Sequence, residues 1–172
     1  MVAKVHYRRA VETDIVVLAR HHRAMFEEMR SPATLCLADN CCAPGKDVQA
    51  GVDFDALEQS HKQKLAEQLP DGTCVAWVAE HEGMVVASGG VSMIKTTPVP
   101  EDPSYTIGFI HSIYTDRAWR RKGIAATIVD RLLEYCAGIG ISRVQLGASE
   151  AGKKLYAEKG FSPLANVMIR WL

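Results

Sequence analysis

Apolar residues follow two different periods along the chain, and together they predict a protein of mixed helices and strands. Short runs that are continuously apolar, or that alternate with polar residues, are typical of strands covered on one or both faces. Between them lie longer segments whose apolar residues recur every three to four positions, as on one face of a helix. The predicted strands are 4–9, 74–80, 84–94, 106–115, 144–146 and 167–171.

The first helix is predicted after residue 13, where Thr13 or Asp14 offers an N-cap. A second helix starts at Asp53 or Asp55 and runs to Leu69; its apolar stripe is thin, which predicts weak packing. Residues 31–51 show no period and are predicted to form a loop. His22 lies on the apolar face of the first helix and is expected to be a packed side chain rather than a ligand. That face comprises Ile15, Leu18, Ala19, His22, Met25, Phe26 and Met29.

Two further helices are predicted in the last third of the chain. One runs from Gly123 to Cys136, and Gly138 or Gly140 ends it. The other is capped by Ser149 and stops at the Lys159-Gly160 pair, which puts a cation in its last turn. Helices and strands therefore alternate without an internal repeat, and we expect a single α+β domain over residues 1–172.

Composition agrees with a globular chain. Of 172 residues 48% are hydrophobic, which excludes disordered and fibrous classes. No apolar run reaches the roughly 18 residues of a membrane-spanning helix, and the N-terminus shows no signal-peptide pattern. We expect a soluble cytoplasmic protein without a membrane partner.

The charge is balanced in total but uneven along the chain. Lys and Arg number 20, as do Asp and Glu, which makes a nucleic-acid partner unlikely on charge grounds. Up to Thr115 there are 10 basic and 15 acidic residues, whereas from Asp116 onward there are 10 and 5. The basic part suits an anionic ligand and the acidic part a cationic one; solvated surfaces are the other interpretation.

The five cysteines predict neither disulfides nor a metal site. An odd number without a secretory signal fits reduced thiols. Cys36, Cys41 and Cys42 are close in sequence, but no Cys-x-x-Cys pair or second cluster completes a tetrahedral shell. Cys74 and Cys136 lie in apolar patterns, which argues against covalent nucleophiles. We expect no metal.

The segment 114–126, Tyr-Thr-Asp-Arg-Ala-Trp-Arg-Arg-Lys-Gly-Ile-Ala-Ala, joins a strand end, a basic turn and a helix start. The first turn of a helix has unpaired N–H groups and a positive dipole end, so this segment can bind an anion. Gly123 lets a ligand approach the backbone. The Gly-x-x-x-x-Gly-Lys-Ser/Thr phosphate loop is absent, and Gly138-Ile-Gly140 lacks the third glycine of a dinucleotide fold.

Two motifs at the expected separation resemble those of the GCN5-related N-acetyltransferases. Residues 120–125, Arg-Arg-Lys-Gly-Ile-Ala, are similar to the family's Arg/Gln-x-x-Gly-x-Gly/Ala signature. Residues 155–161, Leu-Tyr-Ala-Glu-Lys-Gly-Phe, resemble its closing Leu-Tyr-x-x-x-Gly-Phe element. The resemblance covers the chain from about Thr106 onward and implies a mixed, mostly antiparallel sheet flanked by helices. It also implies that the parallel strands 106–115 and 144–148 splay apart around acetyl-CoA.

By position, the resemblance also implies a set of contacts to acetyl-CoA. The backbone of Ile113, Tyr114 and Thr115 would pair with the pantetheine arm. Ser149, where the family often has Asn, would offer a hydroxyl. The pyrophosphate would meet backbone N–H groups or side chains of the basic turn, which comprises Arg120 as a brace, Arg121, Lys122, Gly123, Ile124, Ala125 and Ala126.

The reaction that the resemblance implies is direct attack of a primary amine on acetyl-CoA in a ternary complex. Tyr156 would protonate the leaving thiolate, since a phenol stays protonated at neutral pH; the alternative is a core aromatic. His111 is the candidate base, with a pKa near 6.5 in water, and Glu27 or Glu28 acting through water is the alternative. A small cationic amine is the expected acceptor. A macromolecular amine (a protein N-terminus, lysine or aminoacyl-tRNA) and a non-catalytic CoA sensor remain open, and a homodimer is common in the family.

Overall fold

The computed structural model describes residues 4–30, 51–164 and 170. Most of the loop predicted over 31–51, and all but Arg170 of the strand predicted over 167–171, lie outside the described residues. The cysteines 36, 41 and 42 lie outside them as well. The elements are β1 (His6–Arg9), α1 (Ile15–Met29), α3 (Phe54–Gln68), β2 (Cys74–His81), β3 (Met84–Lys95), β4 (Thr106–Thr115), α4 (Ile124–Gly138), β5 (Val144–Leu146) and α5 (Glu150–Glu158), with 3₁₀ turns at Glu12–Asp14 and Arg117–Trp119.

The strands form one five-stranded sheet in the order β1-β2-β3-β4-β5. Neighbouring strands are antiparallel except β4 and β5, which are parallel. The predicted α+β fold with a mixed, mostly antiparallel sheet is therefore confirmed. One boundary differs, because β5 ends at Leu146 and residues 147–148 are not part of the strand.

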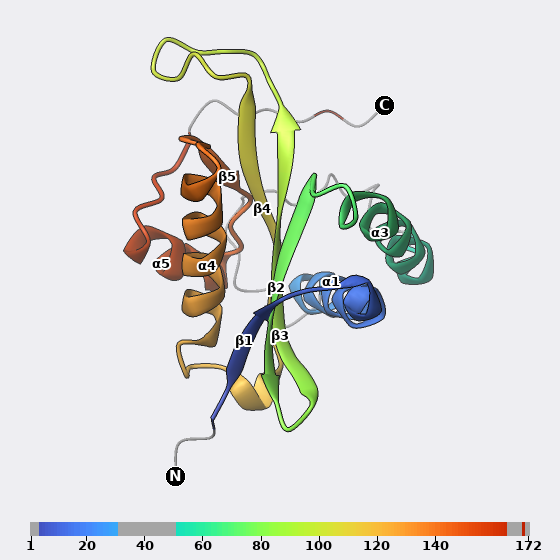
Figure 1. The fold of residues 1–172 in the computed structure, drawn as a ribbon. Helices are drawn as coiled ribbons and strands as arrows, with labels where there is room; N and C mark the ends of the chain where they lie inside the picture. Colours follow the sequence, from blue (N-terminus) through green and yellow to red (C-terminus); the bar gives the residue numbers. More distant parts are fainter. Residues whose placement is uncertain (1–3, 31–50, 165–169, 171–172) are drawn as a thin grey trace.

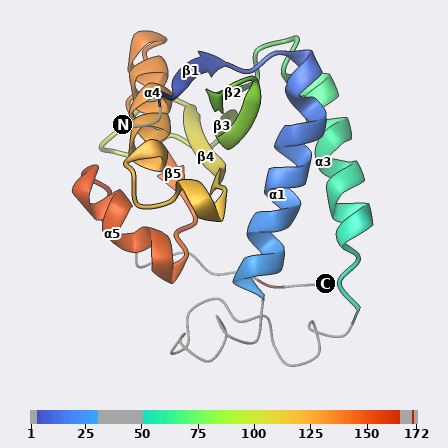
Figure 2. The ribbon, with the colours of Figure 1, turned by 90° about the horizontal axis from the view of Figure 1, so that it is seen from below.

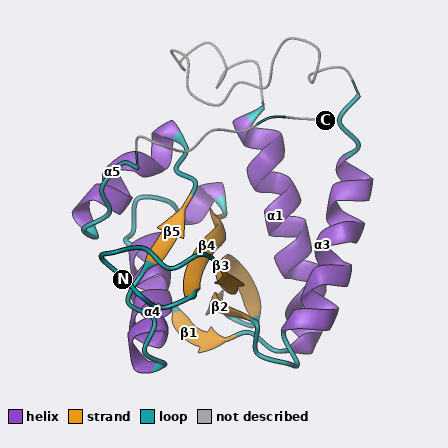
Figure 3. Cartoon of the chain, turned by 90° about the horizontal axis from the view of Figure 1, so that it is seen from above, coloured by secondary structure: helices purple, strands orange, loops and turns teal. Residues whose placement is uncertain are grey.

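Helices cover both faces of this sheet. Figure 1 shows the sheet nearly edge-on, with α4 and α5 on one side and α1 and α3 on the other. Views along the perpendicular direction show α1 and α3 side by side, with α4 and α5 across the sheet from them (Figures 2 and 3). The strands are therefore buried on two sides, as the continuous apolar run of β2 predicts.

The face under α4 is an aliphatic core. Two glycines allow the helix to approach the sheet: a Cβ on Gly108 would lie 2.9 Å from Cys136 Sγ, and one on Gly89 would lie 2.8 Å from Ile128 Cγ2. Burying this many aliphatic side chains is the main source of stability, at roughly 1.5–3 kcal/mol for each large one. The buried members are Val75, Ala79, Val86, Ala87, Val91, Ile110, Ile124, Ile128, Leu132 and Cys136.

The face under α1 and α3 is smaller in its apolar part and more polar. Its apolar cluster consists of Ala10, Leu18, Leu65, Cys74, Ala76 and Val78. The second helix, predicted to pack weakly, has two buried side chains, Leu65 at 1% and His61 at 6% exposure. The thin apolar stripe of α3 is continued by polar side chains that the protein also buries.

The two aspartates predicted to cap the first helices have different partners in the structure. The Asp53 carboxylate accepts hydrogen bonds from the backbone N–H groups of Asp55 and Ala56, so Asp53 is the N-cap of α3. Asp14 occupies the N-cap position of α1, as predicted, but its side chain makes no capping hydrogen bond to that helix. Its carboxylate instead accepts from Val11 N–H and pairs with the Arg8 guanidinium, which holds the pKa of Asp14 below its usual range.

In the part of the chain that the structure describes, no helix has the length and apolar character needed to cross a membrane.

Candidate active site

Strands β4 and β5 pair over three residues only. Gly108, Phe109 and Ile110 lie opposite Val144, Gln145 and Leu146, and the pairing ends there. Strand β4 continues to Thr115 and has no strand beside this edge within the described ranges. An unpaired strand edge presents N–H and C=O groups that can hydrogen-bond an extended ligand. Ile113, Tyr114 and Thr115 all lie on this open stretch.

The basic turn after β4 leads directly into α4. Gly123 has φ +76° at the N-cap position and Arg121 has φ +61°, so the backbone turns sharply here. Arg120 Nε donates to the Thr115 carbonyl at 2.8 Å, which links the turn to the end of β4. Lys122 Nζ donates to the Ala118 carbonyl at 3.0 Å.

The first turn of α4 has no side-chain cap. Ile124 is 3% exposed and belongs to the core, which anchors the turn. The adjacent Ala125 and Ala126 add only a methyl group each beside the first-turn N–H groups. This geometry fits an anionic ligand such as a pyrophosphate, because those groups and the helix dipole are available to it.

Tyr156 lies on α5, on the same side of the sheet as α4 (Figure 1). Its ring packs over Gly152, where a Cβ would lie 2.9 Å from Tyr156 Cε2. Burial raises the pKa of the phenol, so it is a proton donor rather than a phenolate at neutral pH. Ser149 precedes α5 at the N-cap position, but its side chain makes no capping hydrogen bond, contrary to the prediction.

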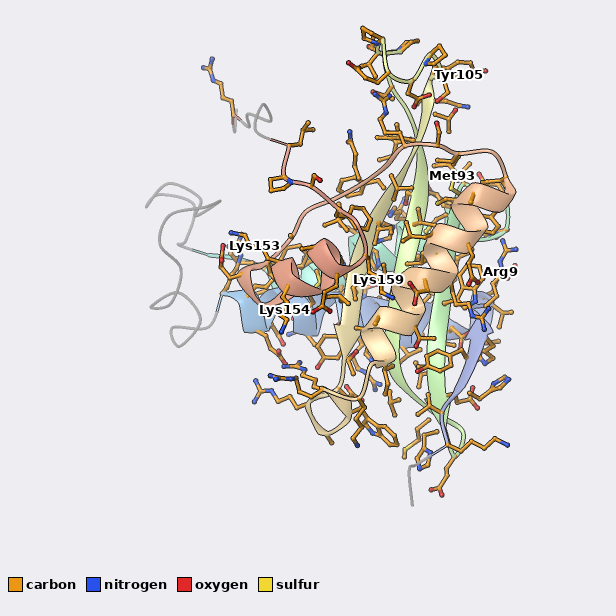
Figure 4. All side chains as sticks on the ribbon, turned by 90° about the vertical axis from the view of Figure 1, so that its left-hand side faces the viewer. Arg9, Met93, Tyr105, Lys153, Lys154 and Lys159 are labelled. Atoms are coloured by element: carbon orange, nitrogen blue, oxygen red, sulfur yellow. The ribbon has the colours of Figure 1, made fainter. Side chains whose placement is uncertain are left out.

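Helix α5 is joined to α4 by an ion pair. Lys159 Nζ lies 2.6 Å from Asp130 Oδ2, and Figure 4 shows Lys159 at the junction of the two helices, with Lys153 and Lys154 on α5. The pair helps to hold the helix that carries Tyr156 in place.

A β-bulge in β4 changes the direction of its side chains. Ser112 and Ile113 lie opposite the single residue Gly89 of β3, and Ser112 has φ +57°. Because of the bulge, two consecutive polar side chains, His111 and Ser112, lie on the face covered by α1 and α3. Ser112 Oγ is 2.9 Å from His111 Nδ1 and 2.7 Å from Nδ1 of His22 on α1.

His111 is held at its other ring nitrogen too. Nε2 is 2.9 Å from Ser92 Oγ, 3.1 Å from Lys64 Nζ and 3.8 Å from Cys74 Sγ. A lysine ammonium can only donate, so Nε2 accepts and Nδ1–H donates to Ser112 Oγ. Gly90 makes room for this ring, because a Cβ there would lie 3.0 Å from His111 Cε1.

Two more histidines surround His111. His61 of α3 stacks on His22, with ring centroids 3.8 Å apart, and meets the His111 ring edge-on at 5.9 Å. We refer to His22, His61 and His111 as the histidine cluster. The prediction that His22 is a packed, hydrogen-bonded side chain agrees with these contacts. Sequence reasoning missed His61 and Lys64, whose only signal was their spacing of three residues on one helix.

The fold keeps the histidine cluster neutral. Burial, followed by the nearby Lys64, lowers the pKa of His22 to about 4. Burial lowers the pKa of His61 to about 3 and that of His111 well below 6.5, again with a contribution from Lys64. Burial also lowers the pKa of Lys64 and raises that of Cys74. A neutral imidazole can accept a proton, so His111 satisfies the first condition for a base.

The histidine cluster borders a cavity of about 400 Å³, which is large enough for a small-molecule substrate. None of the residues found around it is Asp or Glu, so in the described part the acidic half of the chain contributes no carboxylate to this lining. The lining residues are His22, His61, Lys64, Gln68, Thr73, Ser92, Met93, Ile94, Phe109 and His111.

The two carboxylates considered as alternative bases are held by arginines. Glu27 Oε1 lies 2.7 Å from Arg23 Nε. Glu28 lies 2.7 Å from Arg120 and 3.2 Å from Arg117, which connects the end of α1 to the basic turn. Both carboxylates are therefore engaged in ion pairs with arginines.

No group of three or more His, Cys, Asp and Glu side chains among the described residues is arranged to hold a metal ion.

Comparisons with known proteins agree with this geometry. The model of the acetyltransferase (GNAT) family matches residues 45–161. A GCN5-related N-acetyltransferase from Ralstonia eutropha is 27% identical, with a TM-score of 0.80 and coverage of 98% of this chain and 99% of that one. A search of the curated proteins gave no significant match.

Two further solved structures share the fold at lower identity. A predicted acetyltransferase from Clostridium acetobutylicum, solved with acetyl-CoA, is 21% identical, with a TM-score of 0.78 and coverage of 97% and 96%. Glucosamine-6-phosphate N-acetyltransferase from Arabidopsis thaliana is 18% identical, with a TM-score of 0.63 and coverage of 98% of both chains.

Proposed function

This chain belongs to the GNAT acetyltransferase family, and from that premise we propose that it transfers the acetyl group of acetyl-CoA to a small primary amine by direct attack in a ternary complex. One observation carries the proposal. After Ile110, β4 loses its β5 partner on one edge, while His111, the residue before the bulge, lies beside the 400 Å³ cavity on one face. An extended thioester and an amine can then approach the same stretch of strand from two directions.

The residues of the open edge and the basic turn fit acetyl-CoA. Ile113, Tyr114 and Thr115 would hydrogen-bond the pantetheine arm through their backbone. The uncapped turn from Arg121 to Ala126 would bind the pyrophosphate, with Arg120 bracing the turn, Lys122 near a phosphate and the Ser149 hydroxyl as a further donor. Acetyl-CoA supplies an activated acyl group that an uncharged amine can attack.

His111 is the proposed base. An alkylamine is protonated in water and must lose a proton before it can attack. The positive charge of Lys64 and the partial burial of the cavity favour the uncharged form of an amine bound beside them. His111 Nε2 then accepts the proton that the amine releases, and Ser112 and Ser92 hold the ring in position. Glu27 and Glu28 are not assigned this role, because arginines engage both carboxylates and neither residue lines the cavity.

Tyr156 is the proposed acid. Its buried phenol remains protonated and would donate to the thiolate that leaves, while a backbone N–H of Ile113 or Tyr114 would stabilise negative charge on the carbonyl oxygen. In this arrangement the base and the acid approach from opposite sides of the sheet, His111 from the α1/α3 side and Tyr156 from the α4/α5 side.

The test is to mix the purified chain with acetyl-CoA and separate panels of amines, and to measure free thiol together with the mass of the acetylated product. The panels are small amines, peptides with free N-termini or lysines, and aminoacyl-tRNA. Thiol release with small amines supports the proposal. Release with macromolecules alone would support the second acceptor class. Acetyl-CoA binding with no release from any panel would indicate a sensor.

The base assignment has its own pH signature. The pKa of His111 lies well below 6.5, so the acid limb of kcat/KM that it causes should also lie well below pH 6.5. His111→Gln should remove that limb and lower kcat/KM by about 100-fold at neutral pH, in the range typical of general bases. His81→Gln, which changes a histidine at the far end of β2, should keep the profile. A limb that persists in His111→Gln assigns the base elsewhere.

A further inference from the structure

Lys64 is a half-buried cation that no carboxylate among the described residues neutralises, whereas Arg8, Arg143 and Lys159 each pair with one. Lys64 Nζ contacts Ser92 Oγ at 3.0 Å and His111 Nε2 at 3.1 Å, and no Asp or Glu among the described residues forms an ion pair with it. Lys62, two residues earlier on α3, pairs with Glu58 at 2.7 Å. A half-buried ammonium without a counter-charge is unfavourable, and proteins usually avoid it.

The described residues around Lys64 do not supply the missing negative charge. The histidine cluster is neutral, and neutral imidazoles and hydroxyls offer hydrogen bonds but no countercharge. Burial lowers the pKa of Lys64, which is the expected response of a cation without a partner. The described lining of the cavity therefore carries a single positive charge and no negative one.

The rest of the lining is suited to an apolar group. Phe109 and Ile94 contribute apolar surface on the strands, while Gln68 and Thr73 offer neutral polar groups at the end of α3 and the start of β2. A complementary ligand thus combines one anionic group with a small apolar part. No arginine is found in this lining, which favours a singly charged carboxylate over a phosphate, since phosphates are usually held by arginine forks or several donors.

We propose that the acceptor is an amine that also carries a carboxylate, an amino acid with an apolar side chain, whose carboxylate pairs with Lys64 while its amine lies at His111. This inference rests on the proposed acetyl transfer and specifies its substrate class. Lys64 is then a residue that determines specificity.

The pairing also prepares the base. In the structure Lys64 donates to His111 Nε2, the same atom that must accept the proton of the amine. A carboxylate on Lys64 offers the ammonium a stronger acceptor than an imidazole does. Binding of the acceptor therefore turns Lys64 away from His111 and frees Nε2. The amine N–H bond breaks as the proton moves to Nε2, and the nitrogen lone pair forms the new N–C bond as the thiolate leaves.

Matched acceptors test this directly. The common amino acids are compared with their carboxamides, with leucine, leucinamide and 3-methylbutylamine as the reference set, and coenzyme A release is measured at pH 7.5. We expect at least one amino acid with an apolar side chain to exceed its carboxamide by 10-fold or more in kcat/KM. The amine of an amino-acid carboxamide is less basic than that of the amino acid, so more of it is uncharged and reactive at pH 7.5. This difference alone would favour the carboxamide, which is the opposite of the expected result. Equal use of both forms, or preference for the decarboxylated amine, overturns the inference.

The variant Lys64→Met keeps most of the unbranched side chain and removes its charged end. For the preferred amino acid it should lower kcat/KM by about 10- to 100-fold, as expected for a charge-assisted hydrogen bond, with the larger part in KM. For the matching carboxamide the change should be below about threefold. Lys62→Met on the same helix is the control and should leave both values unchanged. An equal loss for both acceptors in Lys64→Met would show a structural role and overturn the assignment.

Two further arms separate the possible failures. O-phosphoethanolamine is compared with ethanolamine; if the phosphate compound alone is preferred, the anion is not a carboxylate and the inference is wrong. Binding of N-acetyl-leucine and N-acetyl-leucinamide is measured by calorimetry with wild type and Lys64→Met. If no amine is acetylated but the carboxylate compound binds through Lys64, the proposed transfer fails while the carboxylate site stands. If neither compound binds and no amino acid is favoured, the carboxylate site is overturned.

Discussion

The two faces of the same sheet bury side chains of opposite polarity. Under α4 the buried side chains are aliphatic or small, and two glycines allow helix and sheet to approach closely. Under α1 and α3 the protein buries imidazoles and hydroxyls, and it half-buries a lysine. Figure 1 shows these layers on opposite sides of β3 and β4.

The difference shows which side carries stability and which carries reactivity. Apolar burial lowers the free energy of the folded state without any titrating group. A buried neutral histidine destabilises the folded state at acidic pH, because the histidine binds a proton in the unfolded chain but not in the folded chain. Burying the polar face therefore lowers the stability of the fold at acidic pH, and the 400 Å³ cavity lies on that face.

The largest expected effect comes from the aliphatic face. Leu132 of α4 is fully buried, so Leu132→Ala should lower the free energy of unfolding by about 2–5 kcal/mol through lost burial and the cavity left behind. Urea unfolding followed by circular dichroism measures this. Arg131→Ala, an exposed neighbour on the same helix, is the control and should change stability little. Activity per folded molecule should stay within twofold; a loss of stability below 1 kcal/mol would contradict the role given to this core.

The polar face should make stability depend on pH. The folded pKa values of His22 and His61, about 4 and about 3, lie below the unfolded value near 6.5. Above pH 6.5 both the folded and the unfolded chain hold these histidines neutral, so they add no pH dependence to the free energy of unfolding. Stability falls as the pH drops below 6.5 toward the folded pKa values. After allowing for the part of each ring that faces solvent, we expect a loss of about 2–4 kcal/mol between pH 7.5 and 5.5.

Urea unfolding at both pH values checks this, with two variants. His61→Asn should reduce the pH-dependent loss by about 1 kcal/mol, whereas His6→Asn, at an exposed position on β1, should leave it unchanged. Equal stability at pH 7.5 and 5.5 would mean that the histidine cluster is not held neutral.

Tyr156 tests whether the chemistry is confined to the polar face. Tyr156→Phe removes only the phenolic O–H, so kcat should fall by about 10- to 100-fold. A larger loss would be expected if the leaving group were more basic, because a thiolate can leave without being protonated. KM for acetyl-CoA should change by less than about twofold. Tyr135→Phe, a half-buried tyrosine of α4, is the control. Full turnover in Tyr156→Phe would remove this residue from the reaction and leave the α1/α3 face as the site of all acid and base steps.

The smallest effect is expected where the two sides are joined. Glu28 links α1 to Arg117 and Arg120, and surface ion pairs of this kind contribute roughly 0–1 kcal/mol. Glu28→Gln should therefore cost less than about 1 kcal/mol of stability. It should also lower KM for acetyl-CoA by about twofold, because the arginines lose a competing carboxylate. The difference should vanish in high salt, which screens the charges; Glu27→Gln is the control, and a raised KM would contradict this view.

Much of the fold could be predicted from local patterns. The strand of β2 and the helix that starts after Gly123 each depend on residues adjacent in sequence. The exceptions were caps and packing. The Asp14 carboxylate pairs with Arg8 and makes no capping hydrogen bond to α1. The thin apolar stripe of α3 is supplemented by His61, which is buried against rings of α1 and β4.

The candidate site divides in the same way. By itself the sequence determined the basic turn and its helix start, because unpaired N–H groups and a glycine with positive φ are properties of one continuous segment. Only the tertiary structure decided the polar cavity. Its groups come from α1, α3, β3 and β4, and the direction of Ser112 depends on a bulge whose cause is the pairing with β3. Charge neutralisation is likewise a property of neighbours in space, so no local pattern could reveal that Lys64 has no carboxylate partner among the residues that the structure describes.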